Sequence, residues 1–358
     1  MKRLLTCAFL ACLLCSPASA QDSAPLIGPA PTTLTPELIN SASIADVPAE
    51  YVPPSISKPT WLPATAASKG WPILAPAVKA PPNAAVVKLE VLLDRVGASP
   101  GVIDGYDGEN LRKAIAAVQI MQGGKPDGLL SAATIHALDQ GGPVIGTYTI
   151  TEADVSAIVP PLPSDYAQMA KLSFLGYTSV AEELAERFHM DQKFLEALNP
   201  DAHFLAGESI FRTITGANKQ GVVTRIEADK GARQVRAYGA DGVLIAAYPA
   251  TIGSASTPSP SGTDTVVAVA ENPTYTYNPN LNFKQGDNDT VLTIPPGPNG
   301  PVGSVWIALS EPTFGIHGTP GPSLIDKASS HGCVRLTNWD AEELAHMVKK
   351  GTIVQFQS

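Results

Sequence analysis

Hydrophobic residues recur at helical spacing in the stretch between residues 84 and 138. Apolar positions three and four residues apart predict two helices, and Ser131 can cap a third, short helix that runs to Leu138. Turn signals separate the helices at residues 100–105 and 126–128. The pattern predicts a small three-helix bundle. The apolar positions of its first two helices are Val87, Leu89, Val91, Leu92 and Val96, followed by Leu111, Ala114, Ile115 and Val118.

A second helical stretch covers residues 179–199. It begins with Ser179, and Glu182 stands three residues later, which is the arrangement of a capping box. We expect two short helices that each bury one side. The apolar residues available for that burial are Val180, Leu184, Phe188, Phe194, Leu195 and Leu198.

From Gly221 onward the apolar period changes to two. Alternation at residues 235–237 and 243–247, with turn signals beside both, predicts hairpins. A helix is expected over residues 341–349, with Asp340 as its cap. The C-terminal domain is therefore predicted to be mainly β. Its further strand candidates are residues 265–271, 304–309 and 352–356.

The N-terminus has the composition of a secretory signal peptide. Lys2 and Arg3 precede an apolar run over residues 4–14, and small residues follow at positions 18–20. This run is shorter than the roughly 20 apolar residues that a transmembrane helix needs, so we expect no transmembrane span. A lipoprotein signal that modifies Cys12 is the alternative interpretation.

Residues 21–82 are rich in Pro, Ala, Ser and Thr and show no sustained apolar period. Such a composition predicts an extended, flexible linker.

Composition narrows the functional classes. Loss of Lys2 and Arg3 with the leader changes the formal net charge from −9 to −11, which argues against nucleic acid as a partner. Three of the four cysteines also lie in the leader, so the mature chain keeps Cys333 alone. A lone thiol in an oxidising compartment is either buried and inert or kept for chemistry.

The sequence around Cys333 favours chemistry. The stretch Ser330-His331-Gly332-Cys333-Val334-Arg335-Leu336 follows His317-Gly318-Thr319 in the chain. A nucleophilic thiol needs a neighbouring imidazole or cation, which His317 and Arg335 can supply. Gly332 lets the backbone turn sharply before the thiol. The amides of Gly332 and Cys333 can then point at a developing oxyanion.

The C-terminal residues resemble the catalytic domain of L,D-transpeptidases of the YkuD type, from Val222 to Phe356. The motifs that carry the resemblance, in the family's order, are "IGSASTPSPSG", "NPTYTYNP", "IPPGPNGPVG", "HGT", "SHGCVRL" and "TNWD". The resemblance implies a β-sandwich-like catalytic fold with no cofactor. It implies that Cys333 attacks the L,D bond of a peptidoglycan tetrapeptide stem, releases D-alanine and forms a thioester. His317 would be the general base and later acid, oriented by the carbonyl of Gly318, and Cys333 the target of carbapenems.

Other residues near the motif have two interpretations. Arg335 either favours the thiolate or a substrate carboxylate, or pairs with a nearby acid. His331, Ser330 and Gly332 are expected to shape the loop that carries Cys333. Three aromatic residues are expected either in a substrate channel or in the core, namely Tyr277, Trp306 and Phe314.

Two further resemblances concern the N-terminal parts. Residues 84–138 resemble a peptidoglycan-binding-like domain through "LLDRVGASPGVIDG", "GENLRKAIAAVQ" and "PDGLLSAATIHAL". Residues 179–199 and the following "AGESIF" resemble the helices and last strand of a LysM module, although no first strand is recognisable before Leu175. The helical domain either binds peptidoglycan or spaces the catalytic domain.

The predicted organisation is multidomain: a mainly β catalytic domain preceded by a small three-helix bundle and a small α+β LysM-like segment. Its boundaries are a signal peptide at residues 1–20, a linker at 21–82, the peptidoglycan-binding-like domain at 83–141, the LysM-like segment at 164–215 and the catalytic domain at 221–357. The layout resembles Gram-negative forms, which implies a periplasmic location beside the cell wall.

Three functions are weighed. The first is a transpeptidase, whose acyl acceptor is a second stem peptide, an outer-membrane protein, or water in an L,D-carboxypeptidase. The second is a cell-wall zinc peptidase or amidase with His317, His331 and Cys333 as ligands. The third is a non-catalytic wall-binding protein. The single Cys beside Gly fits a nucleophile better than a zinc site.

Overall fold

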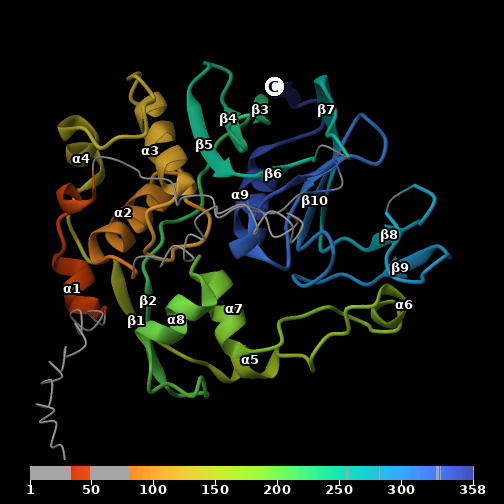
Figure 1. The fold of residues 1–358 in the computed structure, drawn as a ribbon, viewed down its shortest axis with the longest axis horizontal. Helices are drawn as coiled ribbons and strands as arrows, with labels where there is room; N and C mark the ends of the chain where they lie inside the picture. Colours follow the sequence, from red (N-terminus) through yellow and green to blue (C-terminus); the bar gives the residue numbers. More distant parts are fainter. Residues whose placement is uncertain are drawn as a thin grey trace, which may run out of the picture. The chain divides into compact units, whose positions relative to one another are not determined.

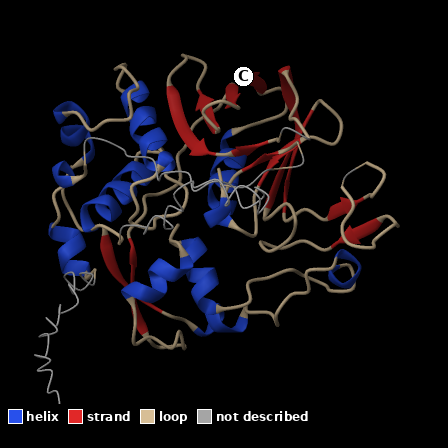
Figure 2. Cartoon of the chain, in the orientation of Figure 1, coloured by secondary structure: helices blue, strands red, loops and turns tan. Residues whose placement is uncertain are grey.

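The structure is a computed structural model that describes residues 34–48, 81–254, 257–281, 283–327, 330 and 332–357. These residues belong to one compact unit, Leu34–Ser358, drawn in Figures 1 and 2. The predicted signal peptide and most of the predicted linker lie outside the described residues. No helix within the described ranges is long and apolar enough to cross a membrane.

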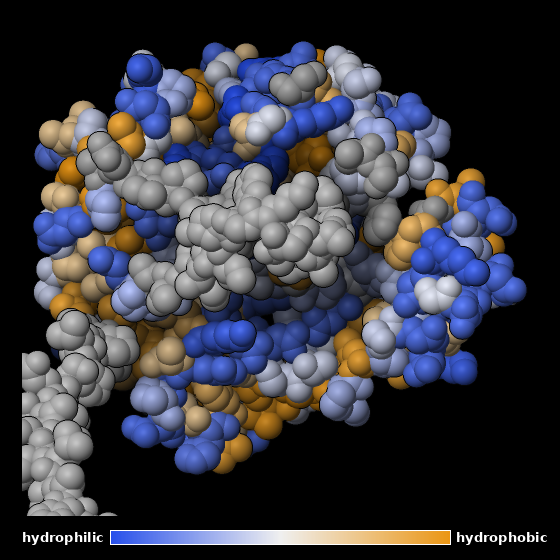
Figure 3. Space-filling view, in the orientation of Figure 1, coloured by the Kyte–Doolittle hydropathy of each residue, from blue (hydrophilic) through white to orange (hydrophobic). Residues whose placement is uncertain are grey.

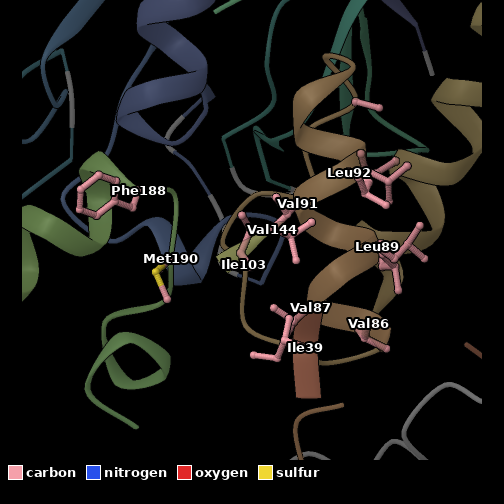
Figure 4. Close-up of a cluster of buried hydrophobic side chains, with 14 of the residues drawn as sticks. Ile39, Val86, Val87, Leu89, Val91, Leu92, Ile103, Val144, Phe188 and Met190 are labelled. Carbon is pink, nitrogen blue, oxygen red and sulfur yellow. The ribbon is translucent and has the colours of Figure 1, made fainter. Parts of the chain in front are cut away.

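The helices predicted between residues 84 and 138 are present. They are α2 (Ala84–Arg95), α3 (Glu109–Met121) and α4 (Ala132–Leu138). As expected, Ser131 caps α4, because its side chain accepts a hydrogen bond from Thr134 N. Buried side chains of α2 lie at the centre of the hydrophobic cluster shown in Figure 4, with Leu89 and Val91 fully buried.

The prediction of an extended linker is wrong for residues 34–48. This part forms α1 (Pro36–Ser41) and a 3₁₀ turn, η1 (Ile44–Asp46). Thr35 caps α1, Pro36 occupies the start of the helix, where its missing N–H costs nothing, and Ile39 and Ile44 are buried against α2. A few well-placed apolar residues are therefore enough to dock this segment.

A two-stranded antiparallel sheet frames the second helical unit. Its strands are β1 (Ile145–Thr149) and β2 (Ser209–Thr213). β1 lies before Leu175, in a region where the sequence analysis recognised no strand. Residues 150–178 separate it in the chain from the helices of this unit, so the strand and the helices do not form a continuous pattern. That intervening stretch contains α5 (Glu152–Ser156) and α6 (Tyr166–Met169).

The helices of this unit are α7 (Val180–Arg187) and α8 (Gln192–Leu198). The side chain of Ser179 accepts from Glu182 N, so the predicted cap is present. The return bond of a capping box is replaced, because Glu182 Oε2 accepts from the amide and hydroxyl of Thr178 instead.

The C-terminal domain is mainly β, as predicted. Within the described ranges its main sheet has nine strands in the order β5-β4-β3-β13-β7-β10-β11-β12-β6. The long strand β7 joins two halves, since it pairs with β13 near its start and with β10 along the rest. The strands are β3 (Arg225–Asp229), β4 (Gln234–Tyr238), β5 (Leu244–Pro249), β6 (Thr251–Ile252), β7 (Gly262–Glu271), β10 (Val305–Leu309), β11 (Gly315–His317), β12 (Val334–Arg335) and β13 (Ile353–Gln357).

A small hairpin and a helix complete this domain. The hairpin consists of β8 (Tyr275–Tyr277) and β9 (Leu292–Ile294), and a 3₁₀ turn, η3, spans Pro322–Leu324. Helix α9 (Asn338–Met347) packs against β10 and β11. Its cap is Thr337, whose hydroxyl accepts from Asp340 N, so the expectation that Asp340 caps the helix is wrong. The helix starts at Asn338, three residues earlier than expected, because Thr337 has the extended backbone of a cap.

Backbone hydrogen bonds join the helical domain to the catalytic sheet. Ser99 N donates to Ala247 O at 2.9 Å, and Ala247 N donates to Gly97 O at 2.8 Å. Lys113 of α3 forms an ion pair with Asp326 at 2.6 Å. On the face shown in Figure 3, hydrophilic side chains predominate and hydrophobic ones lie between them. The backbone bonds and the ion pair thus join the helical domain to the C-terminal domain within one compact unit.

Candidate active site

Three adjacent strands position the candidate catalytic residues. In β11, His317 lies opposite Trp306 of antiparallel β10 and opposite Arg335 of parallel β12. Directly paired residues present their side chains on the same face of a sheet. Cys333 directly precedes β12, two residues before Arg335. The sheet register thus places the strand that follows Cys333 beside the strand that carries His317.

His317 is buried and tightly oriented. Its side chain belongs to a residue only 4% exposed, and its Nδ1 atom donates to the carbonyl oxygen of Gly318 at 2.7 Å. This is the orienting hydrogen bond that the family resemblance implied. Burial and the charge of Arg335 lower the pKa of His317 to about 3, against the opposing effect of the Gly318 bond. The ring is therefore neutral at pH 7, and Nε2 carries its lone pair.

Trp306 is a wall of this site. Its indole stacks on the His317 ring, with centroids 5.4 Å apart and planes 21° apart. The same indole lies so close to Gly315 that a Cβ there would approach it to 2.5 Å. Gly315 therefore makes room for the ring that holds His317 in place.

Cys333 carries a partly buried free thiol. Its Sγ atom is 3.8 Å from the carbonyl oxygen of Thr313. Burial raises the pKa of the thiol above its ordinary value, although the Gly315 amide and the charge of Arg335 act in the opposite direction. At neutral pH the Cys333 thiol is thus protonated and the His317 imidazole is neutral, which are the protonation states that general-base catalysis needs.

The loop that carries Cys333 is fixed on both sides. Gly332 has φ +109°, and a Cβ there would meet the Phe314 ring at 2.7 Å, so only glycine fits without strain. Ser330 Oγ donates to Cys333 O at 2.7 Å. Thr257 Oγ1 donates to Ser330 O at 3.0 Å, which ties the loop to the "IGSAST" segment. His331 lies outside the described residues.

Arg335 pairs with His317 in the sheet, two residues after Cys333. Among the described residues its buried Nε atom has no hydrogen-bond partner, and burial lowers the pKa of its guanidinium. Its charge acts on Cys333, His317 and the hydroxyl of Tyr166. No ion pair of Arg335 is found among the described residues. A cation beside the thiol fits the first of the two interpretations.

The expected channel residues occupy different surroundings. Tyr277 is 0% exposed, and its hydroxyl donates to Asn288 O and accepts from Gln285 N, so its polar end is satisfied within the protein. Trp306 and Phe314 instead contact His317 and Gly332. Tyr277 therefore supports the β8–β9 hairpin, whereas Trp306 lies beside His317 and Phe314 beside the loop that carries Cys333.

Tyr166 packs against the β8–β9 hairpin without any signal in the sequence. It belongs to the stretch between β1 and α7, yet its ring packs edge-on against Tyr277 at 5.3 Å and Tyr275 at 6.1 Å. Its amide donates to Gln285 Oε1 at 3.1 Å. Only the three-dimensional path of the chain reveals this contact.

Asn338 is a second residue that sequence analysis missed, although it stands in "TNWD". Its Oδ1 atom accepts from Thr319 N at 3.0 Å and from Ser304 N at 3.2 Å. Its Nδ2 atom donates to Glu186 Oε2 at 2.8 Å and to Pro298 O at 3.2 Å. The side-chain amide of Asn338 therefore holds the backbone of the "HGT" segment in place.

Two carboxylates near the motif serve elsewhere. Asp326 pairs with Lys113 and Arg233, and Asp340 accepts from Ser99 Oγ at 3.1 Å. Neither contacts His317, in agreement with the expectation that a carbonyl orients the ring.

Comparison with known proteins identifies two regions of the chain. Residues 223–356 match the L,D-transpeptidase catalytic domain (YkuD), and residues 82–138 match a putative peptidoglycan binding domain. The chain is 33% identical over 177 residues to a putative L,D-transpeptidase YkuD of Bacillus licheniformis, covering 48% of this chain and 90% of that protein.

Two further similar proteins cover less of the chain. A probable L,D-transpeptidase ErfK/SrfK of Escherichia coli is 34% identical over 122 residues, covering 33% of this chain and 39% of the relative. The solved L,D-transpeptidase from Mycobacterium smegmatis is 22% identical, covering 42% of this chain and 64% of that one, with a TM-score of 0.31. The chain thus spans less than two thirds of these two proteins.

Proposed function

Because the chain belongs to the L,D-transpeptidase family and is an L,D-transpeptidase enzyme, we propose that Cys333 forms an acyl-enzyme with a peptidoglycan tetrapeptide stem. The observation that carries this mechanism is the hydrogen bond from His317 Nδ1 to Gly318 O, which leaves the Nε2 lone pair available to take a proton. The peptidoglycan-binding match of residues 82–138 supports peptidoglycan as the substrate.

The first half-reaction forms a thioester. Nε2 of His317 takes the thiol proton as Sγ bonds to the carbonyl carbon between the third and fourth stem residues. The amides of Gly332 and Cys333 stabilise the oxyanion. The imidazolium then donates its proton to the leaving nitrogen, the L,D bond breaks and D-alanine departs.

The second half-reaction reverses these proton movements. An acceptor amine attacks the thioester carbonyl while neutral His317 takes a proton from it. The carbon–sulfur bond breaks, and the imidazolium returns a proton to the leaving thiolate of Cys333. The acceptor is the side-chain amine of a second stem, which gives a 3-3 cross-link, or an amine of an outer-membrane protein. Water in its place gives a carboxypeptidase.

The N-terminal parts fit a location at the cell wall. The order β1-α7-α8-β2, with its antiparallel strands, supports a LysM-like unit interrupted by residues 150–178. This unit and the helical domain would hold the enzyme on glycan outside the cytoplasm, in the periplasm, and a leader such as residues 1–20 would direct export there.

Incubation of the mature protein with purified disaccharide tetrapeptide, followed by mass spectrometry, tests this function. Loss of D-alanine with a cross-linked dimer supports transpeptidation, and loss alone indicates hydrolysis. Cys333→Ala abolishes both products and any covalent carbapenem adduct. Turnover by this variant would rule out the thiol mechanism. Activity that resists iodoacetamide and is lost with a chelator would favour the zinc alternative.

A further inference from the structure

A carboxylate outside the catalytic domain lies behind the catalytic histidine. Glu186 belongs to α7, in the unit framed by β1 and β2, and is only 6% exposed. Its Oε2 atom accepts from Asn338 Nδ2 at 2.8 Å and from the Tyr177 hydroxyl at 3.2 Å. A buried carboxylate with two donors is an anchored group rather than a surface charge.

Asn338 carries this contact to the "HGT" segment. Its Oδ1 atom accepts from two backbone amides, those of Ser304 and Thr319, and it packs so closely on Gly318 that a Cβ there would lie 2.1 Å away. Gly318 O in turn accepts from His317 Nδ1 at 2.7 Å. Three consecutive contacts thus connect Glu186 with the imidazole.

The orientation of the Asn338 amide depends on its acceptors. Its oxygen faces two N–H donors, and its nitrogen faces Glu186 Oε2 and Pro298 O. A flipped amide would set N–H against N–H and oxygen against oxygen. Glu186 supplies one of the two acceptors that fix this orientation, and the bond is charge-assisted whenever the carboxyl is ionised.

We infer that Glu186 is a positioning residue for His317, acting through the Asn338 amide and the backbone at Gly318. This inference rests on the proposed role of His317 as the base. Helix α7 then has a role in catalysis that is separate from any binding of glycan, because its Glu186 supports the "HGT" segment through Asn338.

The neighbouring charges are consistent with such a role. Burial raises the pKa of Glu186 to about 7, while Asn338 and Tyr177 favour its ionised form and Glu182 and Glu342 oppose it. A carboxyl that is buried next to other acids is costly to keep ionised, and the bonds from Asn338 and Tyr177 offset part of that cost.

The test compares three variants in the full mature chain. Glu186→Ala removes the acceptor, whereas Glu186→Gln keeps an acceptor oxygen of similar reach. Glu183→Ala is the control. Glu183 is also buried on α7, but its carboxylate forms an ion pair with Arg187, whereas that of Glu186 accepts a hydrogen bond from Asn338. Turnover of soluble disaccharide tetrapeptide gives kcat and KM, and thermal unfolding reports the stability of each variant.

We expect Glu186→Ala to lower kcat on the order of tenfold to a hundredfold, with KM changed by less than about threefold. A displaced base reduces the stabilisation of the transition state more than it reduces the binding of the substrate. Glu186→Gln should retain kcat within about threefold, and Glu183→Ala should lower only the melting temperature. Asn338→Ala combined with Glu186→Ala should cost less than the sum of the two losses.

Unchanged kcat in Glu186→Ala, an equal loss in Glu183→Ala, no rescue by glutamine, or additive losses in the double variant would each overturn the inference. These outcomes are distinct from a failure of the thiol mechanism, which would appear as turnover by Cys333→Ala.

Discussion

The Nδ1 atom of His317 donates to the main-chain oxygen of Gly318 at 2.7 Å. A carbonyl fixes the ring as firmly as a carboxylate but brings no negative charge to stabilise an imidazolium. Burial and Arg335 accordingly lower the pKa of His317 to about 3. The resting site is therefore an uncharged thiol and imidazole, and charge develops only as substrate reacts.

Alkylation of Cys333 should follow the thiol's own ionisation. Since burial raises the pKa of Cys333 and His317 does not protonate near neutrality, the rate constant with iodoacetamide is expected to rise steadily from pH 7 to pH 10. Mass spectrometry of the intact protein measures this rate. Cys333→Ala controls for reaction elsewhere, and a plateau between pH 5 and pH 8 would show an ion pair instead.

Acid should destabilise the protein through His317. Its folded pKa of about 3 lies below the ordinary histidine value of 6.5, so its contribution is fully present above pH 6.5 and is lost as pH falls toward 3. The free energy of unfolding should fall by up to about 1.4 kcal/mol per pH unit from this group. Urea unfolding at pH 7, 6 and 5 measures the fall.

The variant His317→Gln isolates this effect, because every other ionisable group is common to both proteins and cancels in the difference. Its unfolding free energy should depend less on pH than that of the wild type. Parallel pH profiles for the two proteins would contradict a strongly depressed His317.

Local patterns in the sequence predicted the local features well. Ser131 and Ser179 cap the helices they were expected to cap, because a cap acts on amides within three residues. Strand β1 escaped notice because Ile145 is the one buried residue of this short strand, and its partner β2 lies beyond four helices. Nothing within β1 itself indicates that pairing.

The same limit applies to the site. His317 and Cys333 were identifiable because the resemblance supplies their roles, and Gly318 followed from it. The bond between Glu186 and Asn338 joins residues 152 positions apart. Its existence depends on how α7 docks on α9, which is a matter of tertiary packing and leaves no periodic signal in either helix.

Gly332→Ala should impair activity beyond its cost in stability. Gly332 has φ +109°, which side chains other than glycine rarely adopt, and a Cβ there would lie 2.7 Å from the Phe314 ring. The loop must therefore shift, and Cys333 shifts with it. The strain is about 1–3 kcal/mol, and turnover should fall by at least about tenfold. Urea unfolding and the disaccharide tetrapeptide assay measure the two effects.

Gly351→Ala is the matched control. Gly351 has φ +93°, but a Cβ there meets nothing within 4 Å. It should lose stability through backbone strain while turnover stays at the wild-type level. Equal losses of turnover in both variants would mean that strain alone, and not the position of the thiol loop, accounts for the effect.

Lys113→Met should weaken the union of the helical and catalytic domains. Lys113 and Asp326 form an ion pair at 2.6 Å with side chains 15% and 5% exposed, so methionine leaves a buried carboxylate with Arg233 as its remaining cation. We expect a loss of about 1–3 kcal/mol in unfolding free energy, below the usual cost of a broken buried pair because Arg233 remains. Chemical denaturation followed by far-UV circular dichroism measures it.

Adding Asp326→Asn to Lys113→Met should recover part of that loss, since the unpaired charge is then removed. Lys125→Met is the control, because Lys125 is exposed and its substitution should change the unfolding free energy by less than about 0.5 kcal/mol. If Lys113→Met were as stable as the control, the ion pair would contribute nothing, and the backbone bonds between Gly97, Ser99 and Ala247 would carry the junction.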